Sequence, residues 1–558
     1  MRIVCALAMV LLMTFSAYAE FNASLLLVNG KIYTVDGKNM IVEAVYIRNG
    51  RIAATGKTEK ILRSATPGTQ VVDLKGRTVF PGFIDSHGHM MSLGMNMLNP
   101  DLSKTRSYLD LVSQAANEVA KRKPGEWIIG SGWDQNKWVD KRIPYNTELN
   151  ARTRDNPVML TRIDGHACLV NAAALELAGI TIDTPDPDGG RIVRAPDGTP
   201  TGMLIDRAVN LVASVVPEPD EAQRRRALRL ALNHCTSVGL TTVHDAGVDQ
   251  GTLDLYRDMI DNGTFNFRVY AMLSAGTDAG EAFLSEKPLI GYGQDQLTVR
   301  SVKVMADGAL GSRGAALFEP YSDEAGNSGL IISDFDTIKR IADRALQQGY
   351  QVAAHAIGDR ANNIVLRAYE ASLKENKTRN HRFRVEHAQI LRNSDIDTMA
   401  KLNVIASIQA THATSDMYWV IDRIGKERVN RAYSWRTLLS KHVRIANGSD
   451  FPVESANPLW GFYAAVTRAN HRGQPEGGWR KDQKLTREEA LRSFTIDGAY
   501  AAFEENIKGS IEVGKWADLV VLSKDIMTVP AQEILQTRVL ITLVGGNTVF
   551  RHNAKRSN

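Results

Sequence analysis

The amino-acid sequence predicts an α/β fold: a (β/α)8 (TIM) barrel, a small β-sandwich domain assembled from both ends of the chain, and an insertion after the first barrel strand. Three observations predict it. From residue 79 to about residue 504, short apolar segments typical of strands alternate with segments of helix length. Both ends of the chain carry short β-rich runs separated by turn residues. Five of the 12 histidines lie at the ends of predicted strands, where barrel enzymes place their chemistry.

Residues 1–19 have the features of a secretory signal peptide. Arg2 gives a basic start, the run from Ile3 to Phe15 is almost wholly apolar, and Ala17-Tyr18-Ala19 is a small-residue cleavage pattern. The run is shorter than the roughly 20 residues that a transmembrane helix needs, although a retained anchor is the alternative. We therefore expect cleavage before Glu20, export across the inner membrane to the periplasm or the exterior, and no stable membrane insertion afterwards.

The composition is that of an ordinary globular chain. Hydrophobic residues make up 44% of it, and the net charge of +5, or +4 once Arg2 is removed, comes without any dense run of Lys and Arg. The sequence therefore argues against a nucleic-acid partner. Cys168 and Cys235 remain after signal cleavage, and either a disulfide or two buried thiols would suit them. The oligomeric state is open, a homo-oligomer included.

The segment 20–78 predicts a small sheet. Asn29-Gly30 and Asn49-Gly50 each separate two short β-rich runs, and Asn-Gly is the strongest short signal for a hairpin. Lys75-Gly76 predicts a third hairpin. At the other end, residues 516–522 and 539–544 predict strands, and Gly545-Gly546 turns into a further strand. We expect residues 20–78 and 505–558 to form one composite β-sandwich domain.

Residues 79–504 predict the barrel. A helix is expected near 221–237, and another over 335–347, between Asp334 and Gly349, which are good cap residues. The capping box that begins at Thr486 predicts a late helix through about residue 503. The predicted barrel strands are residues 83–89, 239–244, 267–271, 299–304, 351–355, 383–387, 404–408 and 443–447.

One segment, from about residue 124 to 219, does not follow this alternation. Helical periodicity is weak there, Gly, Pro and Asp are dense, and Asp197-Gly198 predicts a hairpin. We interpret it as an insertion between the first and second barrel strands. Insertions at that position lie on the face of a barrel that carries the chemistry, so this segment is expected to contribute to substrate selection.

The first barrel strand ends in His87-Gly88-His89. On a strand, residues two apart point to the same side, so both imidazoles could reach one cation. Alone, the pair could equally be two ordinary polar residues. The ends of later strands supply candidate partners in His244, Asp245, Lys303, His355, His387 and Asp450.

Lys303 interrupts an apolar strand. Its tip could simply reach solvent, but a lysine held among metal ions and apolar walls would lose its proton readily. The neutral amine could then add carbon dioxide and form a carbamate that bridges two cations. Together with three histidine-bearing strands and an aspartate, the pattern offers the nitrogen and oxygen ligands that zinc accepts.

These residues carry a resemblance to a known family. The segment from Pro81 to His89, followed by Lys303, His355, His387 and Asp450, resembles the metal-ligand pattern of the amidohydrolase superfamily. The resemblance covers essentially the whole mature chain, including the segment Gly514–Leu519 near its end. Further stretches resemble the branch that includes N-substituted formamide deformylase: Gly132-Trp133-Asp134, Asp164-Gly165-His166, Asp307–Arg313 and His355–Ala361.

The resemblance implies roles for the ligands. His87, His89 and Asp450 would hold the more buried metal ion, and His355 and His387 a second one. Lys303, carbamylated, would bridge the two, although a site with one metal is the alternative. We therefore expect one or two divalent ions, with zinc as the metal.

The same resemblance implies a small-molecule hydrolase of non-peptide carbon–nitrogen bonds, such as amides, formamides, N-acyl compounds or cyclic amides. Metal-activated hydroxide would attack the carbonyl carbon, and Asp450 would act as general base and then as general acid. A lactonase, esterase or phosphoester hydrolase, a deaminase and a non-catalytic binding protein are the alternatives. The candidate substrate contacts, each of which could instead be structural, are Trp133, Asp134, His166, His244, Asp307 and Arg313.

Overall fold

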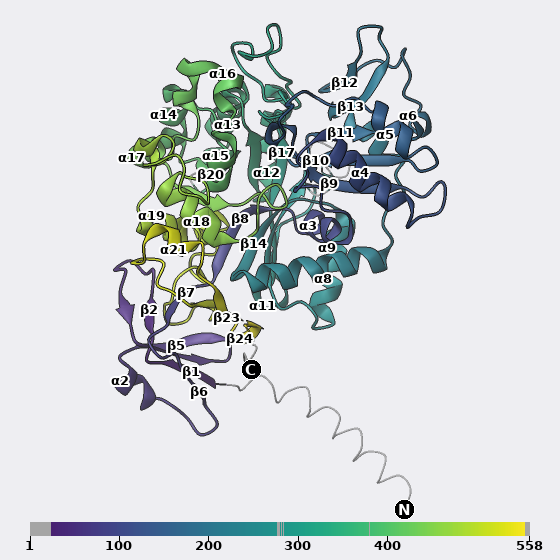
Figure 1. Cartoon of the computed structure of the whole chain (residues 1–558). Coiled ribbons are helices and arrows are strands. Elements are labelled where there is room, and N and C mark those ends of the chain that lie inside the picture. The colour runs from purple at the N-terminus through teal and green to yellow at the C-terminus, as the bar shows by residue number, and fades with distance from the viewer. Residues whose placement is uncertain (1–23, 276–279, 281, 283, 379, 553–558) are drawn as a thin grey trace, which may run out of the picture.

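The computed structural model describes residues 24–275, 280, 282, 284–378 and 380–552, and a parallel barrel forms its centre (Figure 1). Eight strands follow one another in the order β21-β20-β19-β18-β17-β15-β14-β8, and every neighbouring pair is parallel. The two ends of this sheet meet where Gly88, at the end of β8, bridges Phe451, just after β21. The predicted (β/α)8 barrel is therefore confirmed.

The barrel strands match the predicted segments closely. A short strand, β16 (Leu289–Gly291), adds to β17 in the antiparallel direction. The eight strands are β8 (Phe83–Gly88), β14 (Leu240–Val248), β15 (Arg268–Ser274), β17 (Leu297–Met305), β18 (Gln351–Ala356), β19 (Arg384–His387), β20 (Ile405–Gln409) and β21 (Ile445–Gly448).

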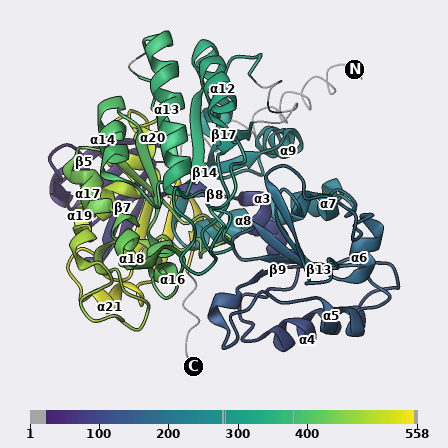
Figure 2. The same cartoon turned by 90° about the horizontal axis from the view of Figure 1, so that it is seen from above.

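Helices surround the barrel, as the view from above shows (Figure 2). The predicted helix over 335–347 is confirmed as α12: the Asp334 side chain accepts a hydrogen bond from the Thr337 amide, and Gly349 ends the helix with a φ of 92°. The outer helices are α3 (Met90–Leu98), α8 (Glu221–Ser237), α9 (Gln250–Asp261), α12 (Phe335–Gln348), α13 (Asp359–Asn376), α14 (Asn393–Leu402), α16 (Val420–Arg428), α17 (Trp435–Ser440) and α18 (Pro458–Thr467).

The late helix is not continuous, so that prediction is wrong. The Thr486 capping box forms as expected, but the helix ends at Ser493, and a second one follows: α19 (Arg487–Ser493) and α20 (Ile496–Ala501). Thr495, between them, has non-helical backbone angles, and its hydroxyl donates to the Leu491 carbonyl at 2.6 Å. A threonine that bonds back to the preceding turn competes with the helical backbone pattern.

The two ends of the chain share a sheet, with the order β24-β23-β22-β7-β2-β3. Its central contact pairs β22 (Leu519–Leu522) with β7 (Thr78–Pro81), which continues directly into the first barrel strand. A second sheet, β5-β4-β1-β6, packs against it over a core that includes Leu27, Val45 and Leu519. The other strands are β1 (Ser24–Val28), β2 (Lys31–Tyr33), β3 (Ile41–Val42), β4 (Ala44–Arg48), β5 (Arg51–Gly56), β6 (Gln70–Asp73), β23 (Val539–Val544) and β24 (Asn547–Arg551).

Two of the three predicted N-terminal hairpins are wrong. Asn49-Gly50 joins the paired strands β4 and β5, with positive φ at both residues, as a type I′ turn requires. The chain also turns at Asn29-Gly30 and Lys75-Gly76, but the strands on either side belong to different sheets. Leu27 and Ile32 face the same core from opposite sheets, so these turns carry the chain across the sandwich.

The segment between β8 and β14 forms its own five-stranded sheet, β12-β13-β11-β10-β9, which lies to one side of the barrel (Figure 2). The predicted hairpin at Asp197-Gly198 joins β12 to β13. The core of this sheet already includes Leu111 and Val112 of α4, ahead of residue 124. The elements are β9 (Ile128–Trp133), β10 (Val158–Arg162), β11 (Ala167–Val170), β12 (Gly190–Arg194), β13 (Pro200–Asp206), α4 (Tyr108–Val119), α5 (Thr147–Arg152), α6 (Ala172–Leu177) and α7 (Val209–Ala213).

Cys168 and Cys235 are both buried and free, in the insertion and in α8, so they are thiols and form no disulfide. The predicted signal peptide lies outside the described residues. Within the described part of the chain, no helix combines the length and the apolar character needed to cross a bilayer.

Candidate metal centre

The ends of β8 and β21 place three of the predicted ligands. Asp85 ties the two strands together, because its Oδ1 accepts hydrogen bonds from the amides of His87 and Ser449, both at 3.0 Å. The amide of Asp450 donates to the His87 carbonyl at 2.7 Å. Asp450 has a φ of 60°, a left-handed conformation that turns its side chain toward the histidines.

The three side chains meet around one carboxylate. Asp450 Oδ1 lies 3.0 Å from His89 Nε2 and 3.5 Å from His87 Nε2. One donor atom each from His87, His387 and Asp450 lie within 4.8 Å of one another. Ligands of a tetrahedral zinc ion are separated by roughly 3.4 Å, so this trio fits a metal ion. The grouping differs from the division implied by the resemblance, which pairs His387 with His355.

Lys303 and His355 complete the cluster. Lys303 Nζ lies 3.0 Å from His87 Nε2, and the rings of His355 and His387 are 4.5 Å apart. Burial lowers the pKa of Lys303 to about 8, against the opposing effect of the carboxylates of Glu386 and Asp450. Five strands thus bring all six predicted ligands into one cluster at the carboxyl end of the barrel.

The imidazoles of His87, His355 and His387 are in the protonation state that binds a metal ion. Burial lowers the pKa of His87 to about 4, and it lowers the pKa values of His355 and His387 well below 6.5, so the rings are neutral at physiological pH. Neutral imidazole is the form that binds metal. His87 Nδ1 hydrogen-bonds the Glu386 carboxylate, and His387 Nδ1 lies 2.8 Å from Gln409 Oε1, so the Nε2 atoms are left for a cation.

Asp450 is ionised in this setting. Burial acts to raise its pKa, but the hydrogen bond to His89 and the neighbouring rings of His87 and His387 bring the pKa well below its ordinary value. Its Oδ1 faces His87 and His89. Among the described residues, Oδ2 accepts no hydrogen bond, and the closest imidazole nitrogen paired with it is His412 Nε2, at 3.9 Å. One oxygen of the carboxylate is therefore available.

Two predicted substrate contacts lie beside the cluster. The His166 ring, from the insertion, is 5.2 Å from the His355 ring, and its Nδ1 lies 2.7 Å from Asp206 Oδ1. Burial opposes protonation of His166, but Asp206 raises its pKa to about 9. Asp307 Oδ1 lies 3.6 Å from His355 Nε2, while the carboxylate accepts three backbone hydrogen bonds from the segments 316 and 357–358.

The other predicted substrate contacts have structural partners. Trp133 is fully buried in the core of the insertion, where its indole donates to the Leu160 carbonyl. Asp134 pairs with Arg162 at 2.6 Å. Arg313 binds Asp323 at 3.0 Å, so its guanidinium is already engaged by a carboxylate.

His244 lies deeper in the barrel. Its Nδ1 is 2.9 Å from a guanidinium nitrogen of Arg384, and its Nε2 is buried without a hydrogen-bond partner among the described residues.

Sequence reasoning missed two residues of the site. Glu386, next to His387, orients His87 and pairs with Arg384 at 2.7 Å; its signal was a carboxylate and a guanidinium two residues apart on a barrel strand. His412 is the third residue of α15 (Ala410–Asp416), the helix that follows β20, and its ring lies 6.0 Å from that of His387 and nearly parallel to it. His412 lies after the end of β20, so it was not among the candidates that were predicted from the residues at strand ends.

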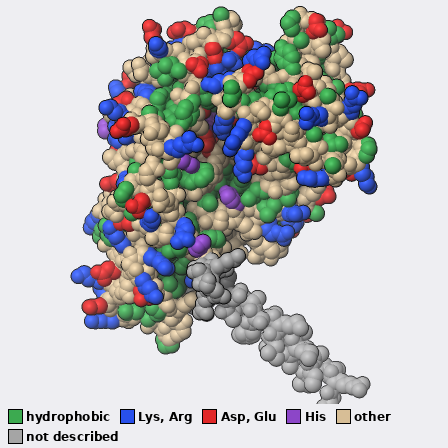
Figure 3. Space-filling view, viewed as in Figure 1, with side chains coloured by type: hydrophobic (Ala, Val, Ile, Leu, Met, Phe, Trp, Pro, Cys, Tyr) green, Lys and Arg blue, Asp and Glu red, His purple; other side chains and the backbone are tan. Residues whose placement is uncertain are grey.

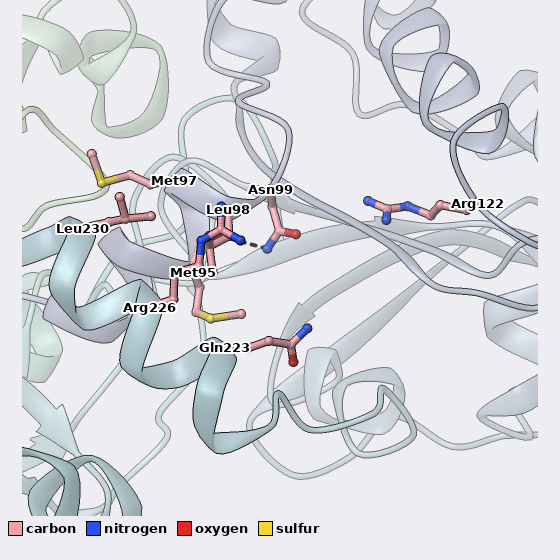
Figure 4. A pocket seen from close by; sticks show the side chains of 8 residues that line it. All are labelled: Met95, Met97, Leu98, Asn99, Arg122, Gln223, Arg226 and Leu230. Carbon is pink, nitrogen blue, oxygen red and sulfur yellow. Dashed lines mark hydrogen bonds between the residues drawn. The ribbon is translucent and has the colours of Figure 1, made fainter.

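Two pockets lie near these elements. One, of about 420 Å³, is lined by Thr411, Ser415 and Glu454, close in sequence to His412 and Asp450. The other, of about 460 Å³, lies between α3 and α8 (Figure 4) and is lined by Met95, Leu98 and Arg226 among others, but by none of the ligands above. In the space-filling view, histidine side chains reach the surface near the middle of the face shown (Figure 3).

Comparisons with known proteins agree with this geometry. The model of the amidohydrolase family matches residues 70–550. The YtcJ protein of Bacillus subtilis is 35% identical over 93% of this chain and 98% of its own. The N-substituted formamide deformylase of Arthrobacter pascens is 30% identical over 94% of this chain and 97% of its own.

A solved structure shows the same fold. The structure of an uncharacterized metal-dependent hydrolase from Pyrococcus horikoshii superposes with a TM-score of 0.74 at 29% identity, covering 91% of this chain and 99% of that one. The family match extends over most of the sequence, and the histidines and Asp450 form a cluster that fits a metal ion. The chain therefore belongs to the amidohydrolase family of metal-dependent hydrolases.

Proposed function

We propose that this protein hydrolyses non-peptide carbon–nitrogen bonds of small molecules, such as amides, formamides, N-acyl compounds or cyclic amides. The observation that carries the proposal is the position of Asp450: one carboxylate oxygen faces the imidazoles of His87 and His89, and the other accepts no hydrogen bond from the described residues. The similarity to N-substituted formamide deformylase along nearly the whole chain supports a carbon–nitrogen substrate.

The metal cluster and Asp450 have separate roles in this reaction. A divalent cation held by the cluster would lower the pKa of a water molecule and polarise the substrate carbonyl. Asp450, ionised because its histidine neighbours lower its pKa, takes the proton of the attacking water on Oδ2. It then delivers that proton to the departing nitrogen, since an amine leaves poorly unless it is protonated.

His166 supports the reaction from the insertion. With its pKa raised to about 9, the ring is protonated at neutral pH and lies next to His355. A cationic hydrogen-bond donor at this place would stabilise the negative charge that develops on the carbonyl oxygen. His166→Gln is expected to lower kcat more than it raises KM.

The proposal is tested with protein purified after supplementation with zinc or manganese, against a panel of N-formyl amines, N-acetyl amines, a cyclic amide and a lactone. We expect turnover of the carbon–nitrogen substrates. Asp450→Asn should lower kcat at least about 100-fold, the lower end for loss of a general acid–base group. Preferential lactone hydrolysis, or wild-type turnover by Asp450→Asn with its metal content unchanged, would reject the proposal.

We also propose that the metal is zinc, at one or two sites, and that Lys303 carries a carbamate when both are filled. The buried, readily deprotonated amine next to His87 supports this. Metal analysis gives the number of ions. Wild-type protein should bind about one ion more than Lys303→Met when both are loaded in bicarbonate, and equal metal contents would contradict the bridging role.

A further inference from the structure

The pocket of about 420 Å³ is lined by residues of α15, of α18 and of the segments next to them. We call it the Glu454 pocket. Its lining includes Thr411, Ser415, Tyr418, Glu454, Trp460 and His471.

Two residues that line this pocket are close in sequence to residues at the metal centre. Thr411 is the neighbour of His412, whose Nε2 lies 3.9 Å from Asp450 Oδ2. Glu454 follows Asp450 by four residues, a stretch that spans at most about 14 Å even when fully extended. Asp450 and Glu454 are therefore close enough along the backbone for a short chain on a substrate at Asp450 to cover the distance between them.

Glu454 supplies the negative charge of the pocket. Its Oε1 accepts a hydrogen bond from the Ser415 hydroxyl at 2.6 Å, and within the described part of the chain the carboxylate forms no ion pair. The side chain is half-buried, so the charge is only partly solvated. A carboxylate in this state favours a cationic partner.

The neighbouring side chains favour the same kind of ligand. Trp460 and Tyr418 line the pocket with aromatic rings, which attract cations through their faces. His471 packs against the Trp460 ring, with centroids 4.5 Å apart, and burial lowers its pKa, so it is neutral at physiological pH. Arg472 also lines the pocket, but its side chain is exposed, and among the described residues it forms no ion pair with Glu454.

We propose that the Glu454 pocket binds a protonated nitrogen of the substrate, so that the preferred substrates are amides carrying an ammonium group a few bonds from the scissile carbon–nitrogen bond. This inference rests on the proposed function for its catalytic consequence, but not for binding. Glu454 and the ring of Trp460 would hold the ammonium group, and Asp450 would face the carbonyl.

Binding is measured first, by calorimetry on the metal-loaded protein with 1,5-diaminopentane and with its uncharged analogue 1,5-pentanediol. We expect the diamine to bind at least about tenfold more tightly than the diol, and Glu454→Gln to remove this preference. Glu427→Gln, which changes an exposed carboxylate on α16, is the matched control and should leave both affinities unchanged. Equal affinities for the two probes, or equal effects of the two substitutions, would overturn the inference.

Hydrolysis is measured next, with N-formyl-1,5-diaminopentane and N-formylpentylamine as a charged and a neutral pair. The wild type should prefer the charged substrate by about tenfold in kcat/KM, and Glu454→Gln should abolish the preference through KM, with kcat unchanged. If both substrates are cleaved equally well, the pocket assignment fails while the proposed function stands. If neither is cleaved and the diamine still binds through Glu454, the proposed function fails while the pocket assignment stands.

Discussion

Glu386 shows how much of the metal centre depends on a single buried carboxylate. It hydrogen-bonds His87 Nδ1 and pairs with the Arg384 guanidinium at 2.7 Å, and neither partner side chain is exposed. Arg384 and His87 lower the pKa of Glu386 below its ordinary value, against the effect of burial. The Glu386 carboxylate therefore neutralises the buried charge of Arg384, and it also fixes the tautomer of His87.

Glu386→Gln is expected to weaken metal binding about 10- to 100-fold and to destabilise the protein by about 3–5 kcal/mol, because it leaves Arg384 buried without its counter-charge. Chelator competition and urea unfolding measure the two effects. Glu370→Gln, which breaks the exposed pair with Lys401, is the control and should change neither. A Glu386→Gln protein with wild-type metal affinity would refute the supporting role.

Asp416, at the end of α15, predicts a dependence of stability on pH. Burial raises its pKa to about 7, although Tyr433 donates a hydrogen bond to it. Its unfolded pKa is about 3.9, so between these values the folded state binds more protons than the unfolded state, and stability falls as pH rises. Asp416→Asn should therefore gain stability over the wild type by roughly 1 kcal/mol or more from pH 5 to pH 8. Thermal unfolding at both pH values tests this, and a constant difference would contradict it.

At the scale of elements, the packing of α3 on α8 positions a ligand. His89 is the residue that precedes α3, and Gly94 lets that helix approach α8 closely: a Cβ atom there would lie 2.1 Å from the Ala227 carbonyl oxygen. The backbone of α8 cannot move aside as a flexible side chain could. The distance between the two helices therefore influences where His89 points.

Gly94→Ala is expected to destabilise the protein by about 1–3 kcal/mol through overpacking and to lower metal affinity through His89. Gly37→Ala provides the comparison, because a Cβ atom at Gly37 meets nothing within 4 Å. Urea unfolding measures the stability of both variants, and competition with a chelator measures their metal affinity. Equal behaviour of the two alanine variants would show that α3 and α8 can separate freely.

The sequence predicted elements well where local pattern decides the structure. The barrel strands combine an apolar run with polar residues near the carboxyl end, and this local pattern was enough to predict β17 with Lys303 and β18 with His355. The turn at Asn29-Gly30 was predicted correctly, but the predicted pairing of the strands on either side was wrong, because packing between the two sheets determines the partner of β2. His412 escaped prediction because its role depends on how α15 lies over His387.

At the scale of the whole molecule, a buried ion pair links the barrel to the sheet formed by the chain ends. Arg268 of β15 binds Asp518, just before β22, at 2.7 Å, and both side chains are almost fully buried. Asp518 also accepts a hydrogen bond from the Gly545 amide at 2.8 Å. The pair therefore joins strand β15, the start of β22 and the turn before β24.

Asp518→Asn should cost about 3–5 kcal/mol, since it leaves the Arg268 charge buried and unpaired. Asp140→Asn, which removes the partner of the exposed Arg142, should leave the unfolding midpoint unchanged. Differential scanning calorimetry compares them. Matching midpoints for both variants and the wild type would mean that the Arg268–Asp518 contact contributes nothing to stability.

The pairing of β7 with β22 also makes the metal centre depend on the end of the chain. β7 leads directly into the strand that carries His87, yet its neighbour on one side is made from residues 519–522. A chain that stops between Asp450 and β22 contains all six predicted ligands but leaves one edge of β7 unpaired. The strand that introduces the first metal ligands therefore has its full support only in a chain that includes β22.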